Sequence, residues 1–140
     1  MDVKLTWKQD MAFSAIGPSE MEFRFDTHPE TGGTGYGIMP MESLLGSLAA
    51  CCAMDVISIL NKKRQEVHSY KVEIHGDRDP EGTWPRPFKK ITLKHIFTGS
   101  NLDPAAITRA IELSETKYCS VIQTLKYKPE IHSEFEVTQT

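Results

Sequence analysis

A long apolar segment in the first half of the chain constrains its fold more than any other feature. The segment begins at Pro40, and proline is favoured in the first turn of a helix. Apolar residues then occupy nearly every side up to Leu60, and the cationic run at 61–64 suits the carboxyl end of a helix. Because a helix that is apolar all round has to be buried, we expect a long central helix inside the fold.

The same segment is the candidate for a membrane span. From Leu44 to Leu60 it covers 17 residues and includes Asp55, whereas a spanning helix needs about 20 predominantly apolar residues. The first residues of the chain also lack the charged-then-apolar layout of a secretory signal. We therefore expect a core helix, no membrane association and a cytoplasmic protein.

Alternating apolar residues on both sides of this helix predict antiparallel strands. The expected strands are 4–7, 11–16, 21–25, 67–77, 88–97 and 131–137, and two further helices are expected at 105–115 and 120–125. This order predicts an α+β fold with antiparallel sheets around the long central buried helix. The length of 140 residues suits one domain covering 1–140.

Charge and motif content exclude several classes of partner. The 16 basic and 19 acidic residues are interspersed, so nucleic acid is not an expected partner. Residues 26–39 carry Pro29 and four glycines, which predicts an irregular, mobile loop, and no phosphate-binding GxxxxGK[ST] pattern is present. The five histidines lack zinc-site spacing with the cysteines, so neither a metal nor a cofactor is predicted.

The three cysteines are the best candidates for reactive residues in the sequence. Their odd number, without a secretory signal, points to free, metal-bound or redox-active thiols rather than a disulfide framework. Cys51 and Cys52 lie about 100° apart on the helix, so we expect only Cys51 to face a site and Cys52 to pack in the core. Cys119 precedes a short helix whose amino terminus can stabilise a thiolate. Packed, unreactive thiols remain the alternative for Cys51 and Cys119.

Three motifs in this order resemble the OsmC/Ohr family, the osmotically inducible and organic-hydroperoxide-resistance proteins, and especially its OsmC-like branch. They are Pro-x-Glu-x-Leu-Leu from Pro40, Met-Asp-Val at 54–56 after Cys51, and Lys-Tyr-Cys-x-Val at 117–121. The resemblance covers almost the whole chain. It implies an intertwined homodimer with the long helices central and two active sites at the subunit interface.

The resemblance also implies roles for two thiols. In the family's peroxidases a cysteine of the central helix attacks the hydroperoxide, and a later cysteine resolves the sulfenic acid into a disulfide. Cys51 lies eleven residues after Pro40 and matches the first position, and Cys119 matches the second. The implied reductant is a dithiol such as a lipoylated protein.

Two departures from the family pattern concern the groups around the thiol. The peroxidases carry a glutamate directly after the proline, where this chain has Met41 followed by Glu42. They also place an arginine in the early strands or the following loop, and Arg24 is the only arginine before Arg64. Glu42 either accepts a hydrogen bond from that arginine or stabilises the first turn of its own helix.

Asp55 and the neighbouring apolar residues complete the candidate site. Asp55 lies one turn past Cys51 on the same helix face and is either a buried polar contact at the dimer interface or an acid of the site. Apolar residues near the helix are expected to line a pocket that prefers an alkyl hydroperoxide; they are Leu44, Leu48, Met39 and Met41.

These observations indicate a thiol-dependent peroxidase for organic hydroperoxides, with Cys51 and Cys119 as the redox pair and Glu42 and Arg24 as accessory residues. The alternative is a non-catalytic dimeric protein of the same fold that binds a small molecule or senses redox state. Met41 and the absence of arginine from the first 23 residues favour this alternative.

Overall fold

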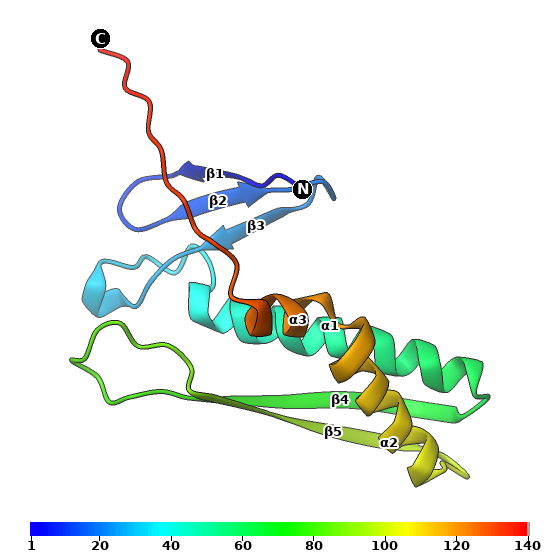
Figure 1. The fold of residues 1–140 in the computed structure, drawn as a ribbon. Coiled ribbons are helices and arrows are strands. Elements are labelled where there is room, and N and C mark those ends of the chain that lie inside the picture. Colours follow the sequence, from blue (N-terminus) through cyan, green and yellow to red (C-terminus); the bar gives the residue numbers. More distant parts are fainter. Residues whose placement is uncertain (140) are drawn as a thin grey trace. The chain divides into compact units, whose positions relative to one another are not determined.

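Helix α1 (Pro40–Lys62) is the longest element of the chain, and in sequence it lies between the first three strands and the last two (Figure 1). The structure, a computed structural model, describes residues 1–139. The elements before α1 are β1 (Lys4–Trp7), β2 (Phe13–Ile16), β3 (Glu22–Phe25) and a 3₁₀ turn (Pro29–Thr31). Those after it are β4 (Glu66–Asp77), β5 (Lys90–Ser100), α2 (Pro104–Leu113), a π-helical turn (Ser114–Tyr118) and α3 (Ser120–Tyr127). The predicted α+β class is confirmed.

Contacts group the chain into two compact units, which are described separately. The first unit comprises Met1–Ala49 and Val72–His95, and the second comprises Ala50–Lys71 and the segment that starts at Ile96. Helix α1 and the two-stranded β4–β5 sheet each contribute residues to both units. The expectation of a single domain over 1–140 stays a prediction.

The first unit contains the predicted meander of three short strands. Strands β1, β2 and β3 form an antiparallel sheet in that order, and Phe13 lies opposite both Trp7 and Phe25. Strand β2 begins at Phe13 rather than at residue 11, because Gln9 and Asp10 adopt positive φ angles and form the turn. Ala15 is buried in this sheet.

The loop at 26–39 is held together by one carboxylate, which the sequence analysis did not anticipate. Asp26 is only 3% exposed, and its Oδ2 accepts hydrogen bonds from the backbone N–H groups of Thr34 and Tyr36 at 2.9 and 3.0 Å. The Thr34 hydroxyl donates to the same oxygen, and the Thr27 N–H donates to Oδ1. These donors hold the backbone of the loop around the carboxylate, and the expected mobility of the loop stays a prediction.

The core of the second unit lies where α1 meets α2. Val56 and Leu60 of α1 and Ala110 of α2 have no exposed surface, and Ala106 is 8% exposed. Tyr70 of β4 and Phe97 of β5 pack against this cluster with their rings stacked at a centroid distance of 4.3 Å.

Helix α1 buries one stripe rather than its whole surface. The fully buried residues are spaced one turn apart at Leu48, Cys52, Val56 and Leu60, whereas the side chain of Met54 is 68% exposed. By length and composition alone α1 could cross a membrane, with a mean hydropathy of 1.9 over its most apolar window. The buried stripe is the pattern of a core helix. A single chain therefore leaves part of the apolar surface of α1 exposed, so the expected burial on all sides is not reached within one chain.

The carboxyl-terminal part departs from the predictions in two places. Among the described residues, none after Tyr127 belongs to a strand, so the predicted strand 131–137 is absent. Its apolar side chains are exposed, by 92% at Phe135, and the described chain provides no strand to pair with this segment. The predicted helix 105–115 instead gives way at Ser114 to the π-helical turn.

The Asp26 contacts predict a pH-dependent contribution to stability. Hydrogen bonds from Thr34, Thr27 and Tyr36 lower the pKa of Asp26 from an ordinary 3.8 to about 2. The folded state therefore favours the carboxylate, and its contribution is complete above about pH 4 and is lost as the pH falls towards 2. We expect Asp26→Asn to lower the melting temperature at pH 7.

Thermal unfolding followed by circular dichroism at pH 7 and at pH 2 to 3 measures this difference. The gap between Asp26→Asn and the unmodified protein should narrow at the acidic pH. An equal gap at both pH values would contradict the role of the carboxylate charge.

Candidate functional site

Helix α1 places two functional groups on one face of the second unit. Cys51 and Asp55 are four residues apart, which puts their side chains one turn apart on the same side of the helix. Both are partly buried. The neighbouring stripe of Cys52 and Val56 packs into the core and fixes the rotation of the helix, so this face has a defined direction.

The third functional group, the thiol of Cys119, lies on the connection between α2 and α3. The turn Ser114–Tyr118 is π-helical and ends at Cys119, whose N–H donates to the Ser114 carbonyl at 2.9 Å. Cys119 is the N-cap of α3, and its sulfur accepts a hydrogen bond from the Ile122 N–H at 3.5 Å. The prediction that Cys119 stands at a helix amino terminus is confirmed. Its side chain is fully buried.

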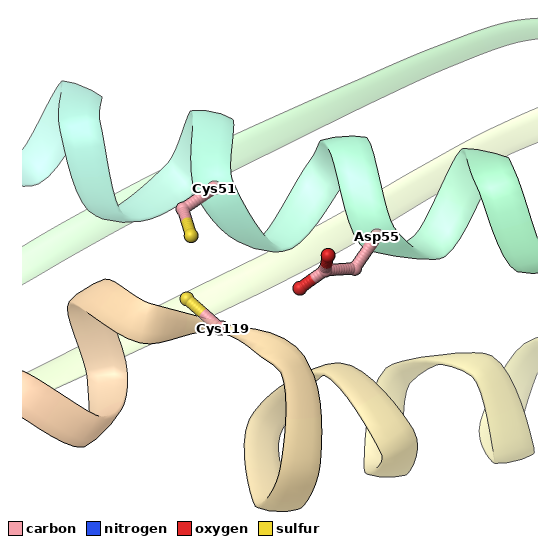
Figure 2. A group of neighbouring side chains, drawn as sticks. All are labelled: Cys51, Asp55 and Cys119. Carbon is pink, nitrogen blue, oxygen red and sulfur yellow. The ribbon is translucent and has the colours of Figure 1, made fainter.

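These three residues converge. The Cys51 sulfur, a carboxylate oxygen of Asp55 and the Cys119 sulfur all lie within 4.8 Å of one another. Figure 2 shows the two side chains of α1 directed towards Cys119, which approaches from the opposite segment. The structure therefore brings together the two thiols that the sequence analysis paired.

Cys52 is buried in the core as expected, but it also reaches this cluster, so the expectation that only Cys51 faces the site is wrong. Its sulfur lies 3.5 Å from the Cys119 sulfur, within hydrogen-bonding range. The side chains of the two adjacent cysteines point about 100° apart around the helix axis. Cys119 packs against α1 between these two directions, so its sulfur is near both. The sequence does contain a signal for this contact, because two adjacent cysteines on a helix can both reach a third cysteine that packs between them.

Ser114 is a further residue of the site that no motif indicated. It is 1% exposed, and its hydroxyl donates to Oδ2 of Asp55 at 3.0 Å. The hydroxyl also lies 3.5 Å from the carbonyl oxygen of Cys52. Ser114 therefore ties the start of the π-helical turn to α1 and orients the carboxylate of Asp55.

The electrostatic surroundings of the thiols favour their neutral forms. Burial is the main cause that raises the pKa of Cys51; the Val121 N–H opposes it, and Cys119 and Asp55 raise the pKa further. Burial also raises the pKa values of Cys52 and Cys119 above the ordinary range. None of the groups with the largest effect on the pKa of Cys51 is a cation, and together they favour the neutral thiol over the thiolate.

Arg24 and Glu42 belong to the first unit and have local partners there. Arg24 forms an ion pair with Glu22 at 2.8 Å, and its guanidinium lies 5.0 Å from the centre of the Tyr36 ring. Glu42 accepts a hydrogen bond from the Met39 N–H at 3.2 Å. This contact agrees with the second role considered for Glu42, which is to stabilise the first turn of α1.

An apolar pocket lies within the first unit. It encloses about 870 Å³ and is lined by Met39, Met41 and Leu45 together with Trp84 and Phe88. Leu44 and Leu48, which were also expected, are not among its lining residues. His28, Arg78 and Arg86 add polar groups to the wall.

Comparison with known proteins assigns the fold to a family. The family profile described as "OsmC-like protein" matches residues 32–134. Protein YhfA of Escherichia coli strain K12 is 36% identical over 138 residues, which cover 98% of each chain. The crystal structure of a hypothetical protein from Aquifex aeolicus VF5 has a TM-score of 0.75 and 32% identity, covering 90% of this chain and 86% of that one.

A more distant structure extends the likeness of fold. An organic hydroperoxide resistance protein OsmC from Legionella pneumophila, described also as a predicted redox protein and regulator of sulfide bond formation, has a TM-score of 0.62. It is 13% identical, and the alignment covers 89% of this chain and 88% of that one. At this identity the match describes the fold alone.

Exposure predicts the order in which the thiols react. Cys51 is partly exposed, whereas Cys52 and Cys119 are 1% and 0% exposed. A limiting amount of N-ethylmaleimide should therefore label Cys51 first, and peptide mass spectrometry measures the order. Unfolded protein is the control, in which all three thiols should react alike. Faster labelling of Cys52 in the folded protein would contradict the observed rotation of α1.

Proposed function

The chain belongs to the OsmC-like family, and from this membership together with the geometry of its thiols we propose that it is a thiol-dependent peroxidase for organic hydroperoxides. The observation that carries the proposal is the position of Cys51. It is the most accessible of the three thiols, and its sulfur lies within 4.8 Å of the Cys119 sulfur. A disulfide between them requires a side-chain rotation and a modest approach of the two segments.

The proposed reaction has two steps on the protein. The Cys51 thiolate attacks one peroxide oxygen and breaks the O–O bond, which forms a sulfenic acid and releases the alcohol after protonation. The Cys119 thiol then attacks the Cys51 sulfur, and water leaves as the disulfide forms. An external dithiol, such as a lipoylated protein, reduces this disulfide by exchange and restores both thiols.

The proposal assigns accessory roles to Arg24 and Glu42. The first step needs a thiolate, while burial and Asp55 favour the neutral Cys51 thiol. Arg24 is the proposed cation that stabilises the thiolate when peroxide is bound, in exchange for part of its pairing with Glu22. Glu42 is proposed to support the start of α1, in keeping with its hydrogen bond to Met39.

A homodimer in the cytoplasm is part of the same proposal. A single chain leaves Met54 of α1 and Phe135 near the carboxyl end exposed by 68% and 92%. Large apolar patches on a protein surface mark interaction sites, and a second copy of the chain is the proposed partner that covers these side chains.

The second candidate function is a non-catalytic protein that binds a small molecule or senses redox state. The raised pKa values of all three thiols favour it, since neutral thiols react slowly with peroxides. Rates of peroxide consumption separate the two candidates: a rate no faster than that of a free thiol would favour the binding protein.

Substitutions at the two thiols should give different kinetics. Cys51→Ser should abolish peroxide consumption, because a serine hydroxyl is not ionised near neutral pH. Cys119→Ser should consume one equivalent and then stop at the sulfenic acid stage, which a dimedone adduct on Cys51 detects by mass spectrometry.

Cys52→Ala is the matched control for these variants. It should retain the first turnover, because Cys51 and Cys119 remain, and lose stability of about 1 kcal/mol from the removed buried sulfur. Loss of turnover in Cys52→Ala with full activity in Cys51→Ser would show that Cys52, rather than Cys51, is the nucleophile.

Substrate preference is a separate prediction. Cumene hydroperoxide should oxidise Cys51 faster than hydrogen peroxide does, because burial of its alkyl group adds binding energy of about 0.8 kcal/mol for each methylene equivalent. Stopped-flow measurement of second-order rates on the reduced protein tests this. Equal rates would contradict an apolar substrate site.

The oligomeric state is tested by analytical ultracentrifugation. We expect a dimer at micromolar concentration, with no folded monomer on dilution, because the exposed apolar side chains need a cover. A stable folded monomer would contradict both the dimer and the proposed sites at its interface.

A further inference from the structure

The donor set of the thiol cluster suits a metal ion, independently of any reaction with peroxide. It combines two thiol sulfurs and one carboxylate oxygen, from Cys51, Cys119 and Asp55, within 4.8 Å of one another. A tetrahedral zinc ion with Zn–S bonds of about 2.3 Å and a Zn–O bond of about 2.0 Å separates such donors by about 3.5 to 3.8 Å. The closure needed to reach these distances is small.

The protein scaffold holds the donors in a manner typical of zinc sites. Two ligands four residues apart on one helix face, here Cys51 and Asp55, form a pair that can grip one ion, and the third comes from a separate segment (Figure 2). The hydroxyl of Ser114 donates to Oδ2 of Asp55 at 3.0 Å, which orients the carboxylate as hydrogen bonds around zinc ligands do.

The chemistry of the donors selects among ions. Sulfur ligands exclude magnesium and calcium, which prefer oxygen, whereas a set of two sulfurs and one oxygen suits zinc. The three donors carry negative charge when they bind, and the groups with the largest effect on the pKa of Cys51, which are Val121, Cys119 and Asp55, are not cations. A divalent cation supplies the missing positive charge. Three protein ligands leave a fourth position for water.

We propose that Cys51, Asp55 and Cys119 form a zinc-binding site in the reduced protein. Zinc at this site holds both sulfurs of the proposed redox pair, so zinc binding and disulfide formation exclude each other. The site itself does not depend on the proposed peroxidase activity, because binding requires only the reduced thiols and the carboxylate.

The test is a zinc titration of the reduced full-length protein after treatment with a chelator, in competition with a chromophoric zinc indicator. We expect one zinc ion per chain. Cobalt in place of zinc should give a sulfur-to-cobalt charge-transfer band and the intense visible bands of a tetrahedral ion, which report the ligands directly.

Variants assign the ligands. Cys51→Ser and Asp55→Asn should each weaken zinc binding by more than about 10-fold, and Ser114→Ala by about 10-fold, the effect typical of a partner that orients a ligand. Cys52→Ala removes a sulfur that contacts the Cys119 sulfur but lies outside the donor set, so it should keep the cobalt spectrum and weaken binding less than Cys51→Ser does. Asp55→Asn changes a partly exposed side chain without changing its size, so the variant should stay folded. Circular dichroism checks the fold, and a loss of zinc binding in the folded variant then reports the loss of a ligand.

Three results would overturn the proposal: no stoichiometric zinc binding by the reduced protein, unchanged affinity in both Cys51→Ser and Asp55→Asn, or loss of binding in Cys52→Ala alone. Peroxide consumption by the zinc-free protein is measured separately. A protein that reduces peroxide and binds no zinc refutes the metal site alone, and one that binds zinc and reduces no peroxide refutes the proposed function alone.

Discussion

The packing of α1 against α2 is the contact on which the thiol site depends. Val56 and Leu60 are completely buried against Ala106 and Ala110, and burial of each large side chain contributes about 1.5 to 3 kcal/mol. This contact sets the rotation of α1, so Cys51 and Asp55 face the segment that carries Cys119. The hydrogen bond from Ser114 to Asp55 adds a polar link at the same place. A change in the helix register would separate the sulfurs and the carboxylate together.

Much of this architecture follows from patterns that are local in sequence. Pro40 and the apolar run after it predicted α1, and alternation of apolar residues predicted the five strands that the structure contains. The position of Cys119 ahead of a short apolar run predicted that it stands at a helix amino terminus, and the structure makes it the N-cap of α3. The motifs around Pro40, Cys51 and Cys119 also identified the OsmC-like family, which the comparisons confirm.

The remaining features depend on contacts between distant residues, which periodicity does not encode. Asp26 orders its loop through donors at Thr34 and Tyr36, and no motif marks those partners. Cys52 meets Cys119 because a segment 67 residues later reaches α1 between two adjacent cysteines. The segment 131–137 has the alternation of a strand but lacks a partner in the described chain, and a strand needs its neighbour's hydrogen bonds.

The central claim of the proposed function is that Cys51 and Cys119 form the redox pair. The direct measurement is disulfide mapping by mass spectrometry after one equivalent of cumene hydroperoxide is added to the reduced protein and free thiols are blocked. We expect a Cys51–Cys119 disulfide, with Cys52 recovered in its blocked thiol form. Recovery of all three cysteines as blocked thiols, or a Cys52–Cys119 disulfide as the first product, would contradict the account.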